Sequence, residues 1–571
     1  MKEDVATVDD RAVPLRVMAI EWNVPMLVRV LVELRDRHGW HTVYCVSEGT
    51  HELVRRHFPQ AIWHDTVDAR FGRPARELAD MRLAVLDQPT AEALGYVQVL
   101  ALRQMDRLEL AGTFALRDRM KLFHRLFGYW SAVLDRLSPH VILMPTVPHV
   151  VYDYILYALA KRRGIPVIMF EVIGSEGLLV PNQTFEVGLA SVISEYRRLR
   201  SQSAASAVTI SERMDKYWRS LRGSYEQAMP YWVRNSRHMS AERKSNPLLA
   251  QFRFAWQRFC HNPLRLWRAP SYVTHAVRSA LRPPAIAGHF RGEFYIAGEA
   301  PRALARKVAR FSRRHRNQLI ARYDSLAKPP DYRQPYVYVA LHAQPELSTN
   351  PMGGIFDEQD IMIGLIASAL PPGWKIYVKE HPAQFSDFAS ERGRWVSCYD
   401  TMLSYSAVTL VPRDTPAFEL IDNAKAVACL VGSSCWEAVA RGIPALMFGE
   451  AWYKGCEGVH TVRSDEDCKE AIARIAGGDR PDPDAVRTFL SVAEKYAVEA
   501  YLNDEDRVIA RIDEATNIER LTSAIAKFYQ NLKSSDHSSS THYARPGPSG
   551  VNEGRTDWPQ YRTQSKLFAG R

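Results

Sequence analysis

Short apolar runs alternate with segments of helical periodicity at both ends of this 571-residue chain. In the first part, predicted strands lie at 15–21, 41–46, 140–144 and 166–170, with helical patterns at 25–37 and 149–163. In the second part, predicted strands separated by helical segments lie at 336–342, 374–379, 407–411, 426–431 and 444–448. Short buried strands that alternate with helices are typical of parallel sheets covered on both faces. The pattern therefore predicts an α/β fold with two Rossmann-like domains.

The clearest single unit is Ala426–Trp452, which is predicted as strand, turn, helix and strand. Its turn is Gly432-Ser433-Ser434, and Gly442 ends the helix. Free backbone N–H groups and the positive end of a helix at this place suit an anion such as a phosphate. Alternatively, Ser433 or Ser434 only caps the helix, and this stretch alone does not decide between the two.

The alternation of strands and helices also suggests where the chain divides. A first Rossmann-like domain is expected at 13–195, including a loop at 171–182, and a second at 331–480. Between them, 196–330 is predicted as a helical, polar and basic insertion. Helices are expected again at 481–533, and the tail 534–571, which has few branched apolar residues, is predicted to be disordered.

Composition narrows the class of protein. Hydrophobic residues make up 46% and charged residues 24%, which is ordinary for a soluble globular protein. No apolar run approaches the length of a membrane span, and the first residues, MKEDVATVDD, carry acids where a signal peptide would be basic and then apolar. The seven cysteines are scattered without a close pair of the zinc-binding type. We therefore expect a cytoplasmic protein with reduced thiols and no structural metal.

The net charge of +10 is concentrated in one segment. Residues 234–328 hold 20 Lys/Arg and 4 Asp/Glu, a local charge of +16, so the remainder carries about −6. Within it, 247–260 places Trp256 and Phe259 at helical spacing among arginines. The segment is either a solvated helical insertion or a surface that contacts anionic lipid or an anionic acceptor. A nucleic-acid binder is disfavoured because no RNA- or DNA-binding motif is present.

Polar side chains follow three strands of the second domain at their carboxyl ends, where α/β sheets bind ligands. After the first, second and fourth strands these are His342, Gln344 and Glu346; Lys379 and His381; and Gly432, Ser433, Ser434 and Glu437. Lys379 and His381 are suited to donate to a phosphate, the serines and backbone N–H groups to complete its cradle, and Glu437 to accept from a ribose. Each cluster alone is more often an ordinary turn whose polar groups are already hydrogen-bonded. Three such clusters at successive strand ends are harder to explain as ordinary turns.

The absence of three sequence motifs narrows the class of enzyme and argues against a bound metal. No Gly-x-Gly-x-x-Gly follows the first strand and no Walker P-loop is present, which disfavours dinucleotide oxidoreductases and ATPases. No Asp-x-Asp accompanies the phosphate-type turns, so a bound divalent metal has no obvious ligands there. We expect no metal and no cofactor.

The stretches 342–356, 371–385 and 430–453 resemble bacterial capsule and surface-polysaccharide biosynthesis proteins of the GT-B glycosyltransferase fold, the group that includes Kdo transferases. A weaker resemblance lies at 139–171. The pairs His381-Pro382 and Ser433-Ser434 are also similar to those of bacterial GT-B sialyltransferases, which use CMP-activated sugars. The resemblance implies two Rossmann-like domains that face a cleft.

The resemblance also implies roles for particular residues. It implies that His381, Ser433 and Ser434 lie near the donor phosphate and Glu437 near its ribose. An acidic residue of the first domain would serve as base or nucleophile. The corresponding stretch, 170–177, offers Glu171 and Glu176, though not as the compact acid-acid-Gly motif of such families, and His149 is the alternative base.

We therefore predict a metal-independent glycosyltransferase with peripheral contact at the inner membrane face through 234–328. Its donor would be a nucleotide sugar, CMP-activated in preference to UDP-activated, and its acceptor a capsular polysaccharide or glycolipid. The first domain would bind the acceptor and the second the donor. The alternatives are a sugar-nucleotide epimerase of the same fold, which would not need the basic insertion, and a non-catalytic assembly or binding component.

Overall fold

The computed structural model describes residues 14–108, 114–174, 177–202, 209–229, 289–291, 294–296, 302–385, 393–504 and 506–538. Glu176, the stretch 247–260 and the tail from 539 onward lie outside these residues, as does most of the basic segment. The chain divides into two units, Met1–Ala526 and Lys527–Arg571. Both large sheets belong to the first unit.

The first sheet has seven strands in the order β15-β6-β5-β4-β1-β2-β3. The strands are β1 (Leu15–Ala19), β2 (Trp40–Ser47), β3 (Ile62–Asp65), β4 (Val141–Leu143), β5 (Val167–Ile173), β6 (Leu178–Asn182) and β15 (Val498–Glu499). The strands from β3 to β5 are parallel, whereas β6 and β15 are antiparallel to their neighbours. The strand order therefore reverses between β1 and β4, and this is where an open α/β sheet opens a crevice for a ligand.

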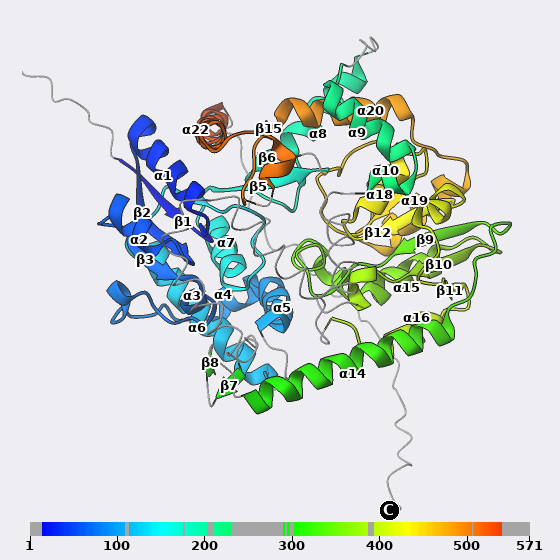
Figure 1. The fold of residues 1–571 in the computed structure, drawn as a ribbon, viewed down its shortest axis with the longest axis horizontal. Coiled ribbons are helices and arrows are strands. Elements are labelled where there is room, and N and C mark those ends of the chain that lie inside the picture. The colour runs from blue at the N-terminus through cyan, green and yellow to red at the C-terminus, as the bar shows by residue number, and fades with distance from the viewer. Residues whose placement is uncertain are drawn as a thin grey trace, which may run out of the picture. The chain divides into compact units, whose positions relative to one another are not determined.

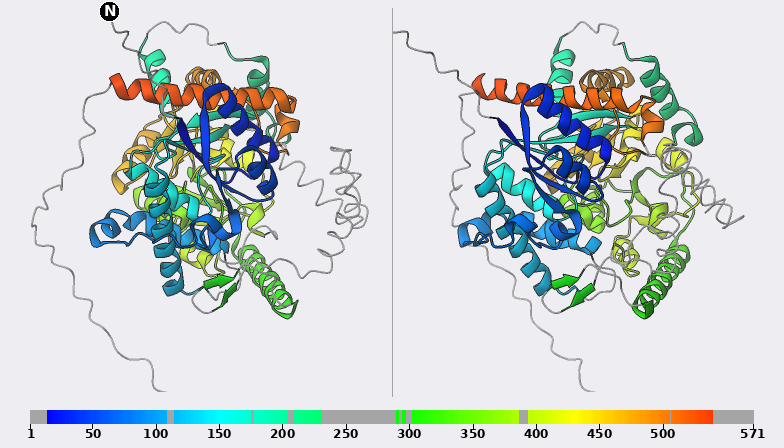
Figure 2. Two further views of the ribbon diagram at one scale, coloured as in Figure 1. Left: turned by 90° about the vertical axis from the view of Figure 1, so that its left-hand side faces the viewer. Right: turned by 60° about the vertical axis from the view of Figure 1, so that its left-hand side comes forward.

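Helices cover both faces of this sheet (Figure 1, Figure 2). They are α1 (Pro25–His38), α2 (His51–His57), α3 (Thr66–Arg70), α4 (Gln88–Ala93), α5 (Gly95–Gln104), α6 (Leu116–Leu137) and α7 (Tyr152–Arg162). Met18 and Ile20 share one core with α6 and α7. Val17 and Ala19 are equally buried but are not part of this core, as expected for side chains that alternate between the two faces along a strand.

The second sheet has six parallel strands in the order β11-β10-β9-β12-β13-β14. They are β9 (Tyr336–Ala340), β10 (Lys375–Lys379), β11 (Val408–Leu410), β12 (Ala426–Cys429), β13 (Ala445–Met447) and β14 (Val459–Thr461). Its order reverses between β9 and β12. The predicted α/β fold with two Rossmann-like sheets is thus confirmed.

Two separate cores cover the two faces of the second sheet. One contains Tyr336 and Tyr338 of β9, and the other contains Val337 and Val339. The first core is completed by α8 (Ala190–Ser201), α9 (Glu212–Arg222), α17 (Ala417–Asp422), α18 (Ser433–Ala440) and α20 (Pro483–Tyr496). The second is completed by α14 (Arg302–Leu326), α15 (Gln359–Ala369), α16 (Cys398–Leu403) and α19 (Asp465–Ala476).

Three secondary-structure predictions were wrong. The loop expected at 171–182 is a hairpin of β5 and β6, because cross-strand pairing outweighs the turn signals of its glycines and proline. The region 196–330 is not wholly helical, since β7 (His289–Arg291) pairs with β8 (Phe294–Ile296). The helical region expected at 481–533 is interrupted after Tyr496 by β15, and α21 (Arg507–Ala510) and α22 (Glu514–Ser538) follow.

Residues 209–229, which belong to the region predicted as a basic insertion, pack against the core and do not form a solvated surface. Helices α9 and α10 (Tyr225–Ala228) bury Trp218, Leu221 and Ala228 in the core on the second sheet. The side chain of Arg441 donates to the carbonyl oxygens of Leu221 and Gly223 at 2.9 and 3.0 Å. This part of the basic region therefore completes the second α/β half.

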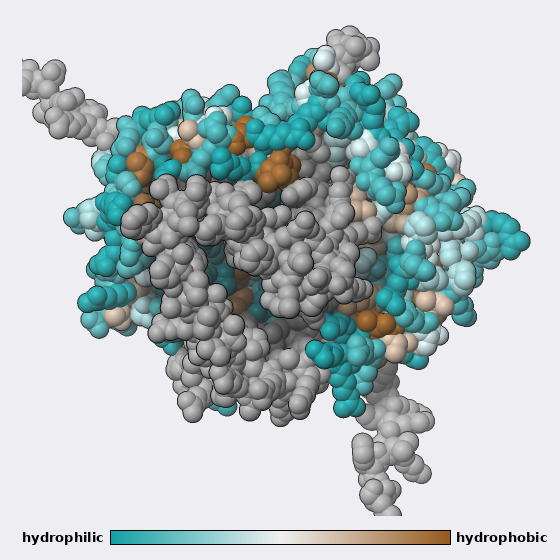
Figure 3. Space-filling view, viewed as in Figure 1, coloured by the Kyte–Doolittle hydropathy of each residue, from teal (hydrophilic) through white to brown (hydrophobic). Residues whose placement is uncertain are grey.

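The described surface is hydrophilic over most of the face seen in Figure 3, and apolar side chains form only small groups on it. Within the described ranges, no helix combines the length and the apolar character needed to cross a membrane.

Candidate functional site

His342 and Gly432 meet where the second sheet reverses its strand order. His342 follows β9, and Gly432 follows β12. A Cβ atom on Gly432 would lie 2.9 Å from Nε2 of His342, so the two are in direct contact. Nε2 accepts from the backbone N–H of Val431 at 3.4 Å, while Nδ1 is buried without a partner among the described residues. Burial lowers the pKa of His342 to about 3, so the ring is neutral at pH 7.

We expect Gly432→Ala to lose about 1–3 kcal/mol of folding free energy, because the added methyl group must push the buried imidazole aside. The backbone at Gly432 has φ −70°, so the conformation itself suits alanine and only the contact is tested. Urea unfolding measures the loss. The double variant with His342→Ala restores the space and should recover part of it; an unchanged midpoint in Gly432→Ala would contradict the contact.

Helix α18 begins directly beyond this contact. Gly432 is its N-cap and provides no side-chain cap, so Ser433 and Ser434 lie inside the helix and do not cap it. The N–H groups of the first turn and the positive helix end therefore face the carboxyl edge of the sheet. Glu437 is buried one turn on; burial raises its pKa, and a hydrogen bond with Ser433 opposes the rise.

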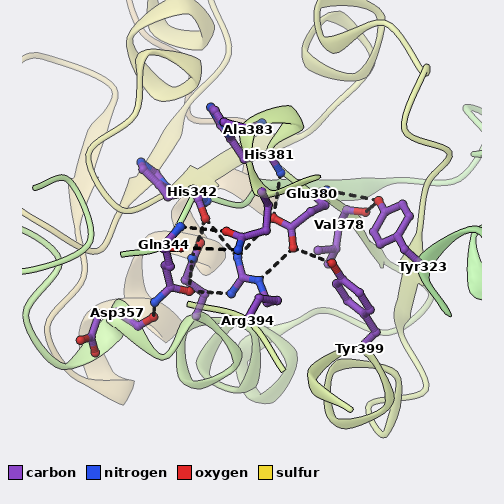
Figure 4. Close-up of polar contacts among 12 residues, drawn as sticks. Tyr323, His342, Gln344, Asp357, Val378, Glu380, His381, Ala383, Arg394 and Tyr399 are labelled. Carbon is purple, nitrogen blue, oxygen red and sulfur yellow. Dashed lines mark hydrogen bonds and ion pairs between the residues drawn. The ribbon is translucent and has the colours of Figure 1, made fainter. Parts of the chain in front are cut away.

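A buried ion pair, which the sequence pattern did not reveal, supports this edge of the sheet (Figure 4). The guanidinium of Arg394 contacts the carboxylate of Glu380 at 2.9 Å, with exposed side-chain fractions of 4% and 0%. Arg394 also donates to the carbonyl oxygen of His342 at 3.0 Å and to Oε1 of Gln344 at 2.6 Å. Tyr399 donates to Glu380 at 2.9 Å. One cation thus ties together the loops that follow β9 and β10.

His381 lies at the surface of this network. Its backbone N–H donates to Glu380 at 2.8 Å, and its Nδ1 accepts from the backbone N–H of Ala383 at 3.1 Å. In the neutral ring the proton therefore sits on Nε2, which leaves an N–H donor on an exposed side chain. Desolvation lowers the pKa of His381, and the nearby carboxylates of Glu346 and Glu380 oppose this. Figure 4 shows His342 and His381 on the same side of the ion pair.

The other predicted site residues that follow strands of this sheet have side chains that hydrogen-bond to the surrounding protein. The side chain of Gln344 donates to the carbonyl oxygen of Asp357 and accepts from Gln359 at 2.9 Å, so its carboxamide is part of the supporting network. Glu346 accepts from the hydroxyl of Ser348 at 2.9 Å. Lys379 donates to the carbonyl oxygen of Thr415. The structure therefore brings together His342, His381 and the start of α18, with Gln344 behind them.

In the first sheet, His149 lies in the loop between β4 and α7, beside the point where the strand order reverses. It lines a cavity of about 210 Å3 together with Glu21, Asn23, Arg70 and Asp153. Burial lowers the pKa of His149 to about 4, with Arg107 adding to the effect. The sequence patterns singled out His149 but not the other four.

Glu171 lies away from this loop, in the middle of β5. It is buried, and Oε1 accepts from the side-chain N–H of Asn182 at 2.6 Å. Burial raises its pKa to about 7 from an ordinary value of 4.5. Its catalytic role stays a prediction, as does that of Glu176.

The raised pKa of Glu171 predicts a pH-dependent stability difference. Between pH 4.5 and 7 the unfolded state loses the proton that the folded state keeps, so the wild type loses stability as the pH rises through this window. Glu171→Gln keeps the acceptor for Asn182 and has no proton to lose. We expect the variant to gain on the order of 2 kcal/mol over the wild type between pH 5 and pH 8 in urea unfolding. An equal difference at both pH values would contradict the burial argument.

Arg107 connects the two sheets. It follows α5 and donates to the carbonyl oxygen of His149 and, at 3.0 Å, to that of Asn350. Beside it, Nε2 of Gln104 donates to Oδ1 of Asn350 at 3.0 Å. Burial lowers the pKa of Arg107 to about 10, while Asp153 and Glu346 attract its charge, so it stays cationic at neutral pH. A cavity of about 490 Å3 lies between the halves, with Arg103, Arg107 and Gln344 among its walls.

Across the described parts of the chain, no three His, Cys, Asp or Glu side chains are grouped so that they could hold a metal ion. The chemistry available at the second sheet is that of neutral imidazoles, backbone N–H groups and a helix end. Such groups favour an anion.

Residues 348–480 match the family of capsule polysaccharide biosynthesis proteins. Solved structures similar to the chain include two β-Kdo transferases, KpsC of Thermosulfurimonas dismutans. The 2,7 transferase is 17% identical, with 38% of this chain and 64% of that one covered and a TM-score of 0.22. The 2,4 transferase is 10% identical, with 62% and 79% covered and a TM-score of 0.26.

A UDP-GlcNAc 2-epimerase of Methanocaldococcus jannaschii is 11% identical, with 83% and 97% covered and a TM-score of 0.22. At such TM-scores these structures carry no weight for the activity. The search of the curated proteins found no match. The family match contains His381 and the start of α18, and it confirms over residues 348–480 the predicted resemblance to capsule polysaccharide biosynthesis proteins.

Proposed function

We propose that this protein is a glycosyltransferase of capsule or surface-polysaccharide synthesis that binds a nucleotide-activated sugar at the second sheet. The observation that carries the proposal is the convergence of His381, His342 and the first turn of α18 on one edge. Nε2–H of His381 and the N–H groups of α18 are suited to the donor phosphates, and Glu437 to the ribose. The first sheet would then bind the acceptor.

The proposed reaction breaks the bond between the anomeric carbon and the donor phosphate. Negative charge develops on the phosphate as it leaves, and donors aimed at that charge lower the barrier. His381 would strengthen its hydrogen bond at this step, and the positive end of α18 would act in the same direction. A carboxylate of the first sheet or His149 would take the proton of the attacking hydroxyl.

Nucleotide binding tests the proposal most directly. We expect CMP, or failing that UDP, to raise the melting temperature, with about 2.7 kcal/mol of stabilisation at a hundredfold excess over the dissociation constant. ATP and NAD should have no effect, and equal shifts with all four nucleotides would refute the assignment. Product analysis then separates the alternatives: a transferase joins the sugar to an acceptor even in the presence of EDTA, an epimerase converts the donor without an acceptor, and a binding component does neither.

The basic segment 234–328 is proposed to contact anionic lipid. Of its described part, α14 carries exposed Arg313 and Arg314, whereas Leu319 and Tyr323 face the core. We expect binding to vesicles that contain anionic lipid, weakened by salt because exposed charge is screened. Each basic residue near such a surface contributes about 1 kcal/mol, so changing Arg253 and Arg258 to Glu should weaken binding at least ~30-fold. Vesicles of neutral lipid serve as the control. Binding that is unchanged both by salt and by these substitutions would contradict the proposal.

A further inference from the structure

The cavity at the carboxyl edge of the first sheet has the chemistry of a sugar-binding pocket. It holds about 210 Å3, and its polar walls are Glu21, Asn23, Arg70, Thr146, His149 and Asp153. These side chains offer two carboxylates, an amide, a guanidinium, a hydroxyl and an imidazole. Nε of Arg70 is buried without a hydrogen-bond partner among the described residues. A ligand with several hydroxyl groups, each both donor and acceptor, would satisfy such walls.

Glu21 is held in this cavity by a strained backbone. It follows β1 with φ +58°, in the left-handed region that residues other than glycine seldom occupy. The flanking N–H groups of Ile20 and Trp22 are tied to the carbonyl oxygens of Leu143 and Val46 at 2.9 and 3.0 Å. Such conformations persist where the surroundings impose them, and they are concentrated at functional sites.

The side chain of Glu21 is positioned but not saturated. Oε1 accepts from the hydroxyl of Tyr152 at 2.7 Å and Oε2 from the side-chain N–H of Asn23 at 2.7 Å. Nη2 of Arg70 lies 3.6 Å away, and 15% of the side chain is exposed. A carboxylate has about four lone-pair sites. Glu21 therefore retains acceptor capacity toward the cavity.

The two other candidate bases of the cavity, Asp153 and His149, make hydrogen bonds to the backbone around them. The oxygens of Asp153 accept from the backbone N–H groups of His149, Val150 and Tyr154 at 2.7–2.9 Å, so this carboxylate holds the start of α7. Nδ1 of His149 lies 2.8 Å from the carbonyl oxygen of Val147, which leaves a lone pair on Nε2. The low pKa of His149 makes that lone pair a weak base.

Arg107 places this cavity beside the carboxyl edge of the second sheet, where the sugar donor is proposed to bind. It binds the carbonyl oxygens of His149 and Asn350, and its charge is attracted by Asp153 on one side and Glu346 on the other. The charge of Glu346 in turn acts on His381. A sugar in the cavity would thus lie across Arg107 from the proposed phosphate site.

We propose that the cavity binds the terminal sugar of the acceptor and that Glu21 takes the proton from its attacking hydroxyl. The inference rests on the proposed function. In the step, the hydroxyl oxygen forms a bond to the anomeric carbon of the donor. The bond from that carbon to the phosphate oxygen breaks, and its electron pair stays on the nucleotide. The hydroxyl proton passes to an oxygen of Glu21.

The test compares Glu21→Gln with the wild type on CMP- and UDP-activated sugars, with water and free sugars as acceptors and release of the nucleotide as the signal. We expect kcat to fall at least 100-fold, with the donor KM and the CMP or UDP affinity within about twofold of wild type. Glu48→Gln, which changes an exposed carboxylate after β2, is the matched control and should behave as wild type.

The outcomes separate the two proposals. Turnover by folded Glu21→Gln within threefold of wild type overturns the role of Glu21 alone. A wild type that binds CMP or UDP but turns over none of the donors overturns the proposed function and, with it, the role of Glu21. If Glu21→Gln melts several degrees lower, Glu21→Asp decides: it keeps the charge on a shorter side chain, and we expect at least tenfold slower turnover with unchanged nucleotide affinity. Wild-type turnover by that variant would refute the inference.

Discussion

Arg394→Met should lose about 3–5 kcal/mol of folding free energy, because it leaves the carboxylate of Glu380 buried without its counter-charge. Both side chains are almost fully excluded from solvent, so water cannot replace the lost partner. The same change removes the donors to the carbonyl oxygen of His342 and the side chain of Gln344. Urea unfolding at pH 7 measures the loss, and nucleotide affinity should fall with it.

A nearby exposed ion pair provides the control for this experiment. Arg413 contacts Asp324 at 2.7 Å, with 41% and 46% of the two side chains exposed. Exposed pairs contribute about 0–1 kcal/mol, so Arg413→Met should shift the unfolding midpoint little. Adding Glu380→Gln to Arg394→Met removes the orphaned charge and should recover much of the stability. A loss below about 1 kcal/mol in Arg394→Met would show that the buried pair does not organise this edge.

His381→Ala should slow sugar transfer by roughly two to three orders of magnitude while the melting temperature stays nearly unchanged. Removing one donor to a developing negative charge typically raises the barrier by about 2.7–4 kcal/mol. The ring is exposed and its one described side-chain hydrogen bond is accepted from the N–H of Ala383, so the fold should lose little. Single-turnover kinetics measures the transfer step, and calorimetry should show weakened CMP or UDP binding.

His124→Ala, an exposed histidine on α6, is the matched control and should leave transfer and nucleotide binding unchanged. Wild-type transfer by folded His381→Ala would remove this residue from the site. It would also remove the main reason for assigning the donor to the second sheet.

Much of the architecture could be predicted from the local pattern. The observed strands β9, β10, β11, β12 and β13 each begin and end within two residues of the predicted ones. Local periodicity is sufficient here because each strand is short, apolar and buried on both faces. The turns after these strands were also recognisable, since glycine, serine, histidine and proline carry backbone preferences of their own. The placement of His381 and Gly432 at one sheet edge follows from parallel strands whose carboxyl ends meet there.

What the tertiary structure decided is which polar groups meet. Glu380 and Arg394 are 14 residues apart, and nothing in their local sequence marks them as a buried pair. Glu21 and Arg107 are likewise ordinary charged residues until β1, α3 and α7 come together around one and the two halves around the other. Glu171 looked like a loop carboxylate and lies in a paired strand. Periodicity indicates which residues are buried. The partner of a buried charge depends on which segments, distant in sequence, the fold brings together.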